Sequence, residues 1–175
     1  IYQELEKKRV TAPQFAARAR IMELGLVEPL IAGSEEQEGI FGSVAGKGLK
    51  RLPSSVYWNG LGVWGIRKIN CSQSEYHRHV AEVYRRRENA RLRIEKDDSP
   101  ETGTQTWHPR IPDPPEGFPD AIKNIRFNLT LDEANFLRDR LVKSNPESLL
   151  VYLVLNCKPV DCRFVWNHPE MERFP

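Results

Sequence analysis

The sequence predicts a mainly α fold with a helix-turn-helix-like unit, an extended proline-rich strap and one short strand or hairpin. Apolar residues recur at helical spacing behind capping residues, prolines crowd between 109 and 119, and apolar and polar residues alternate at 125–129. A chain of 175 residues fits one domain, or one domain and a small appendage. We divide it into a helical region at 1–95, a loop and strap at 96–123, and a strand with two helices at 124–175 packed on the same domain.

The first region has the start and stop signals of several helices. Thr11 is a capping residue with a proline two positions later, and Gly33 ends the apolar pattern that follows. Pro53 precedes another apolar helical stretch. Helices are expected at 1–8, from Thr11 to Gly33, at 43–49, at 54–64, and from Ser72 or Ser74 through the arginines at 85–87.

The remainder of the chain changes character. Residues 97–104 have the composition of a loop, and five prolines from Pro109 to Pro119 then prevent regular structure. Apolar residues between these prolines indicate a strap packed on the domain. Residues 125–129 alternate as a strand, and Thr130 with Glu133 forms a capping box. The last helix should begin near Asn145–Pro146 and be buried, because 149–155 is apolar all round.

Composition limits the class of protein. The net charge of +2 is too small to indicate a nucleic-acid partner by itself. The odd number of cysteines, Cys71, Cys157 and Cys162, without a CxxC pair, favours free thiols in a reducing, cytoplasmic compartment. No apolar run has the roughly 20 residues that cross a membrane, so no membrane partner is expected. The start at Ile1, already in helical pattern and without Met, predicts a fragment of a longer protein.

Enzymatic and metal-binding motifs are incomplete. The stretch 42–47 resembles a phosphate-binding loop, but Phe41 and Gly48 stand where that loop needs glycine and serine or threonine. His77 and His79, two apart on a helix, point to different sides and do not form a zinc site. We therefore expect no catalytic residue, no cofactor and no metal in this chain.

The stretch 50–68 carries a DNA-binding hypothesis. Residues 41–49 would form the first helix of a helix-turn-helix and Lys50–Pro53 the turn. Base edges would be met by polar residues at the exposed start of the second helix, namely Ser54, Ser55 and Asn59. Phosphates would be met by the nearby basic residues Lys47, Lys50, Arg51, Arg67 and Lys68. The alternative is an ordinary core helix that begins at a proline, and the shortness of the motif favours it.

A basic run supports the same partner. Between Tyr76 and Lys96 seven basic residues stand against three acidic ones, and we assign phosphate contacts to Arg85, Arg86 and Arg87. The alternative is a solvated helix face with intrahelical ion pairs such as Glu82 with Arg86.

Five stretches resemble a bacterial family of unknown function. They are 49–58, 64–66, 115–119, 133–140 and 166–169. The family has no established activity, so the resemblance transfers no catalytic residue. It implies a place in a defence or DNA-processing system.

These observations favour a non-enzymatic DNA-contacting or complex-scaffolding module, with DNA or another protein of the same operon as partner. One alternative is a protein-protein interaction module without DNA binding, in which the strap and exposed aromatic residues dock a partner. The other is part of an enzyme whose catalytic residues lie outside this segment.

Overall fold

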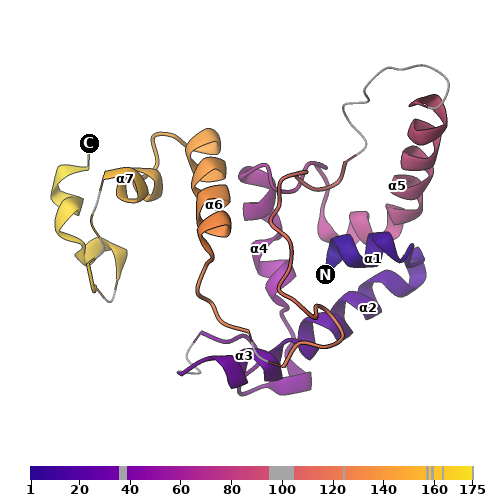
Figure 1. The fold of residues 1–175 in the computed structure, drawn as a ribbon, viewed down its shortest axis with the longest axis horizontal. Coiled ribbons are helices and arrows are strands. Elements are labelled where there is room, and N and C mark those ends of the chain that lie inside the picture. Colours follow the sequence, from indigo (N-terminus) through magenta and orange to yellow (C-terminus); the bar gives the residue numbers. More distant parts are fainter. Residues whose placement is uncertain are drawn as a thin grey trace.

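The computed structural model describes residues 1–35, 39–94, 105–123, 125–156, 158, 160–162 and 164–174. These residues are mainly helical, as the sequence predicts, and contain no strand (Figure 1). In chain order the elements are α1 (Tyr2–Lys7), α2 (Ala12–Gly25), α3 (Val27–Gly33), the 3-10 helix η1 (Gly46–Gly48), α4 (Pro53–Val63), α5 (Gln73–Ile94), α6 (Leu131–Ser144), α7 (Leu149–Asn156), and the 3-10 helices η2 (Val165–Asn167) and η3 (Pro169–Arg173).

The prediction of a strand at 125–129 is wrong, because no strand forms there. Its first residue pairs with a helix, since the Ile125 amide donates to the Pro29 carbonyl at 2.9 Å, and Phe127 and Leu129 are exposed. Gly33 allows this contact, because a Cβ there would lie 2.1 Å from the Ile125 carbonyl oxygen. Within the described ranges, strand pairing is limited to one isolated antiparallel bridge, between Arg67 and Trp107.

Two expected helices differ from the structure. The helix predicted to end at Gly33 is divided at Leu26 into α2 and α3, because Pro29 has no amide to bond the Gly25 carbonyl. The helix expected at 43–49 is reduced to η1. Gly42, just before this stretch, and Gly46, the first residue of η1, have positive φ angles of 90° and 49°, which an α-helix does not contain. The first helix of the predicted helix-turn-helix is therefore absent.

Thr11 is at the cap position of α2, as predicted, but its side chain makes no capping hydrogen bond. Two other capping predictions are confirmed. Ser72 begins α5, with its hydroxyl accepting the Glu75 amide at 3.2 Å. The capping box of Thr130 and Glu133 begins α6 as predicted. Helix α7 begins later than expected, behind Ser148, whose hydroxyl accepts the Val151 amide at 3.3 Å.

Helix α7 is also not the buried helix that the sequence predicts. Val151 is buried, but Leu150, Val154 and Leu155 are 44%, 43% and 56% exposed. In Figure 1, α7 and the two 3-10 helices after it lie at one end of the molecule, beyond α6. Helix α7 packs on α6 and, through Tyr152, against Phe174, and these contacts leave part of its apolar surface exposed.

An aromatic core joins the N-terminal helices to the strap. Tyr2, Phe15, Trp58, Tyr76 and Trp107 come from α1, α2, α4, α5 and the strap, and several of their rings lie within 6.4 Å of one another. The strap has no helix or strand in the part described, 105–123, but Trp107 belongs to the core, so this part is packed as predicted. The expected loop at 97–104 lies outside the described residues.

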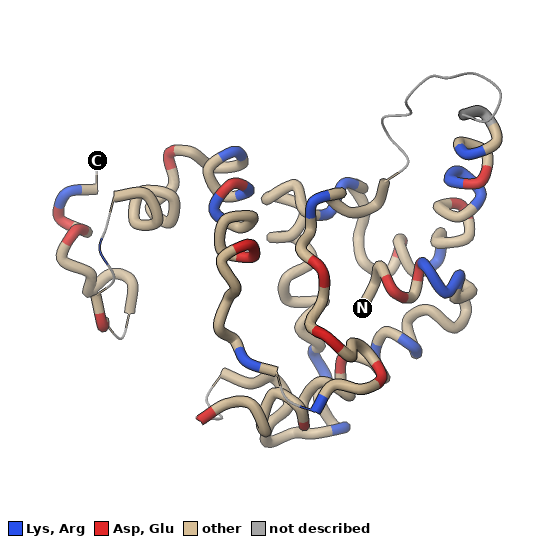
Figure 2. Tube along the Cα trace, viewed as in Figure 1, with Lys and Arg blue, Asp and Glu red and all other residues tan. Residues whose placement is uncertain are grey.

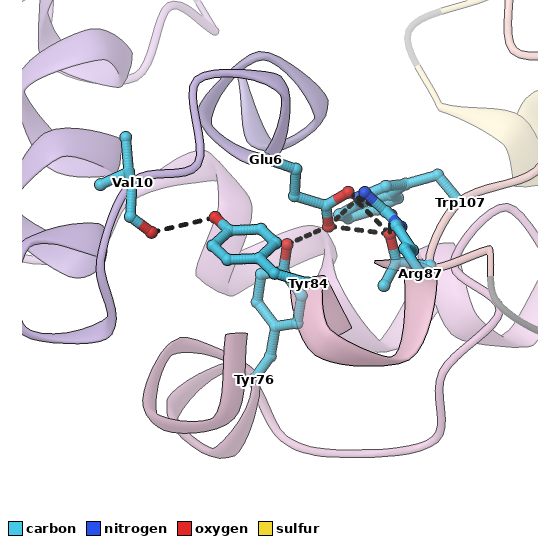
Figure 3. A network of polar contacts seen from close by, with 7 residues as sticks. Glu6, Val10, Tyr76, Tyr84, Arg87 and Trp107 are labelled. Carbon is cyan, nitrogen blue, oxygen red and sulfur yellow. Dashed lines mark hydrogen bonds and ion pairs between the residues drawn. The ribbon is translucent and has the colours of Figure 1, made fainter. Parts of the chain in front are cut away.

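A buried carboxylate fastens α1 to α5 and the strap (Figure 3). Glu6 accepts hydrogen bonds from Tyr76, from Thr106 at 2.8 Å and from Trp107 at 3.0 Å, and pairs with Arg87 at 2.5 Å. Burial, and then the charge of Glu6, raise the pKa of Tyr76. Each donor lies on a segment distant in sequence from Glu6, so this carboxylate holds the tertiary arrangement.

Helix α4 ends in a glycine-dependent turn. The Gly65 amide donates to the Gly62 carbonyl at 3.0 Å and the Ile66 amide to the Leu61 carbonyl at 2.9 Å. This is the Schellman pattern, and Gly65 has the positive φ of 64° that it needs. The turn directs the following residues, 66–68, alongside the strap.

Candidate nucleic-acid interface

The residues assigned to DNA on and before α4 separate into two groups. Lys50 and Arg51 are exposed just before the helix, and Ser55 and Asn59 are exposed on it, one turn apart. Ser54 instead turns inward. Its amide and hydroxyl donate to the Glu23 carboxylate at 2.9 and 2.6 Å, so Ser54 is not free to meet a base edge.

Arg67, assigned to a phosphate contact, is buried with 7% exposure. Its guanidinium donates to the Trp58 carbonyl at 3.3 Å, to the Cys71 carbonyl at 3.2 Å and to the Ile69 carbonyl, and lies 4.8 Å from the centre of the Trp58 ring. The sequence cannot distinguish this structural arginine from its exposed neighbour Lys68. Arg67 therefore supports the turn after α4, and its guanidinium is not available to a phosphate.

The arginines of α5 also divide. Arg85 and Arg86 are exposed, whereas Arg87 bonds Glu6 and Thr106. Arg86 pairs with Glu82 at 3.6 Å, as in the intrahelical alternative. The last turns of α5 extend beyond the helices packed against it, and basic residues lie along them (Figure 2). This face is basic but partly neutralised by its own acids.

The sequence assigns only Lys68 of a second basic surface to DNA, and the other members come from the structure. This surface surrounds His108 and consists of Lys68, Arg110, Arg140 and Lys143, called the basic cluster below. The bridge at 67 and 107 brings the first two together: the Lys68 amide donates to the Thr106 carbonyl at 2.8 Å and the His108 amide to the Ile66 carbonyl at 2.7 Å. Figure 2 shows basic residues at the upper end of α6 and near the top of the strap.

Helix α6 supplies the other half of the basic cluster. Phe136 contacts His108 with 5.4 Å between ring centres. Arg140 and Lys143 follow Phe136 at helical positions i+4 and i+7, so they lie on the same face of α6. The contact of Phe136 with the strap therefore places both cations beside the bridge.

Arg140 is the unusual member. It is only 7% exposed, and its guanidinium has no carboxylate or hydrogen-bond partner within the described residues. Every fully buried side-chain nitrogen in the described residues has a hydrogen-bond partner. Because the Arg140 guanidinium has none, its nitrogens are not fully buried and contact solvent. A Cβ on Gly65 would lie 3.8 Å from Arg140 Nη1, which places the cation at the carboxyl end of α4. That helix end carries only about half an elementary negative charge.

The charges that act on His108 are all positive. Burial lowers the pKa of His108, and Arg140, Lys68, Arg110 and Lys143 lower it further. His108 is therefore neutral near pH 7, and its Nδ1 accepts the Arg110 amide at 3.2 Å. An anion at this position would relieve the repulsion among the four cations.

The sequence does not indicate the cluster as a unit because its members are far apart in the chain. Lys68, Arg110 and the α6 pair come from three separate segments, and of these only Lys68 stands beside another basic residue, Arg67. Only the spacing of Arg140 and Lys143 on one helix face gives a local signal, and such pairs are common on solvated helices.

Other site classes find no support in the described part of the chain. It holds no group of three or more histidine, cysteine or acidic residues placed to bind a metal ion. None of its helices combines the length and the apolar composition that crossing a bilayer requires. Cys71 and Cys162 are free thiols, and Cys157 lies outside the described residues.

Comparison with known proteins identifies the family but no activity. No curated protein and no solved structure matches the chain. One family model covers nearly all of it, residues 1–171, and agrees with the resemblance seen in the sequence. The chain therefore belongs to DUF6361, a family of unknown function.

Proposed function

We propose that this chain is a non-enzymatic DNA-contacting module that binds backbone phosphates through the basic cluster. The observation that carries the proposal is Arg140, a buried arginine without a counter-charge among cations of the same sign. Guanidinium groups bind phosphate oxygens with paired, charge-assisted hydrogen bonds. A backbone phosphate supplies the missing negative charge at this position.

The exposed residues around α4 extend the same surface. Lys50 and Arg51 precede this helix of 11 residues, and Arg140 lies at its other end. An α-helix with its side chains is about 10–12 Å across, and the major groove, about 12 Å wide, admits it. Ser55 and Asn59 lie on the exposed side between these ends and remain the proposed base contacts.

Charge reversal of the basic cluster tests the proposal. Lys68, Arg110 and Lys143 are exposed and are each changed to Glu, while buried Arg140 is left in place. Duplex affinity, measured by fluorescence anisotropy in low salt, is expected to fall more than tenfold, because three phosphate contacts become repulsions.

A matched control keeps total charge equal. Lys7, Lys123 and Arg173 are also exposed, and changing them to Glu lowers the net charge by the same six units, from +2 to −4. This control is expected to lose less affinity than the cluster variant. Equal losses in both variants would show that DNA responds to net charge and not to this site.

A further inference from the structure

A cleft of about 840 Å³ lies on the other side of α4 from Ser55 and Asn59. Its walls come from α1, α2, α3, the segment before α4, α4 itself, the strap and the segment before α6, and they are mostly apolar. Aromatic side chains include Tyr57 and Trp64 of α4 and Trp107 of the strap. Volumes of this size accommodate small organic molecules.

One charged side chain lines this apolar cleft, namely Glu23 of α2. Glu23 is 8% exposed, and its two oxygens accept only the Ser54 amide and hydroxyl. These bonds complete the start of α4, where Leu52 at the cap position offers no side-chain acceptor. Both donors are neutral, and no described side chain forms an ion pair with Glu23.

Ser54 is held by a chain of hydrogen bonds behind the cleft. Gln73 Nε2 donates to Ser54 Oγ at 2.8 Å and to Tyr2 Oη at 2.6 Å. Tyr2 Oη in turn lies 3.0 Å from His77 Nε2, and burial lowers the pKa of His77, so this neutral ring accepts. The Ser54 hydroxyl accepts from Gln73 and therefore donates its own hydrogen bond to the Glu23 carboxylate. The arrangement fixes the carboxylate as an acceptor and leaves no activated serine.

We propose that this cleft binds a small organic cation, an ammonium or guanidinium group on an aromatic or aliphatic body. The carboxylate of Glu23 supplies the counter-charge, and the aromatic walls favour both the apolar body and the positive charge through cation–π contacts. A neutral ligand of the same shape forms no ion pair with Glu23. The site is separate from the basic cluster and goes beyond the proposed DNA contact.

Two probes of nearly equal shape test the proposal. Tryptamine carries an ammonium group where tryptophol carries a neutral hydroxyl. Isothermal titration calorimetry is expected to show tryptamine binding about tenfold or more tightly, and Glu23→Gln to abolish that preference, because the amide keeps an acceptor for Ser54 but has no charge. Glu28→Gln, an exposed change on α3, is the matched control and keeps the preference.

A second variant separates a lost site from a lost fold. Tyr57 is 56% exposed and lines the cleft, so Tyr57→Ala leaves the core intact and is expected to weaken both probes several-fold. Equal affinity for the two probes, a preference that survives Glu23→Gln, or no binding of tryptamine would overturn the proposal. DNA affinity is unaffected by Tyr57→Ala in either case, so this site and the DNA contact fail independently.

Discussion

Replacing Glu6 with Ala is expected to lower the free energy of unfolding by about 3–5 kcal/mol. The side chain is 2% exposed, and its removal leaves Arg87 without its carboxylate. It also leaves the donors of Tyr76, Thr106 and Trp107 without their shared acceptor. Equilibrium urea denaturation followed by tryptophan fluorescence measures the change, since Trp107 is part of the network.

Glu4 provides the control on the same helix. It pairs with Lys7 at 3.6 Å on the surface, and Glu4→Ala is expected to cost less than about 1 kcal/mol because exposed pairs are screened by water. A loss for Glu6→Ala no larger than that for Glu4→Ala would contradict the role of Glu6 as the junction of α1, α5 and the strap.

Replacing Arg67 with Met is expected to cost about 2–4 kcal/mol of stability without changing the duplex affinity of the folded protein. Methionine keeps much of the apolar stem but gives nothing to the carbonyls of Trp58, Ile69 and Cys71. The stacking over Trp58 is also lost. Thermal denaturation gives the stability, and anisotropy at a temperature where the variant is folded gives the affinity.

Lys68 provides the matched control for Arg67 in both measurements, stability and duplex affinity. It follows Arg67 directly but is exposed, so Lys68→Met is expected to keep stability and lose duplex affinity. An affinity loss for Arg67→Met, with stability unchanged, would restore the interpretation of Arg67 as a phosphate contact and would reject its structural role.

The sequence was most informative where a local chemical rule decides the structure. Thr130 with Glu133 and Ser72 before α5 mark helix starts that depend on neighbouring residues only. The failures depend on distant contacts. Alternation at 125–129 suggests a strand, but a strand needs a partner, and Ile125 bonds Pro29 of α3 instead. Apolar α7 lacks enough neighbouring surface to be buried.

The candidate site was less predictable for the same reason. Arg67 and Lys68 are adjacent basic residues, and only the turn after α4 decides which one is buried. Ser54 and Ser55 are likewise equivalent by sequence, but Ser54 points inward because its hydroxyl donates to Glu23 of α2. The basic cluster exists only once α6 and the strap meet at His108. The proposed DNA surface is therefore a property of the tertiary fold.

Duplex binding across a salt series, with the unmodified protein beside the variant carrying Glu at 68, 110 and 143, tests the central claim most directly. Each phosphate contact contributes about 0.9 to the slope of log affinity against log salt concentration. The unmodified protein is expected to bind with a steep slope, and the variant with a slope shallower by roughly three contacts. No duplex binding at low salt, or the same slope for both proteins, would contradict phosphate recognition by the basic cluster.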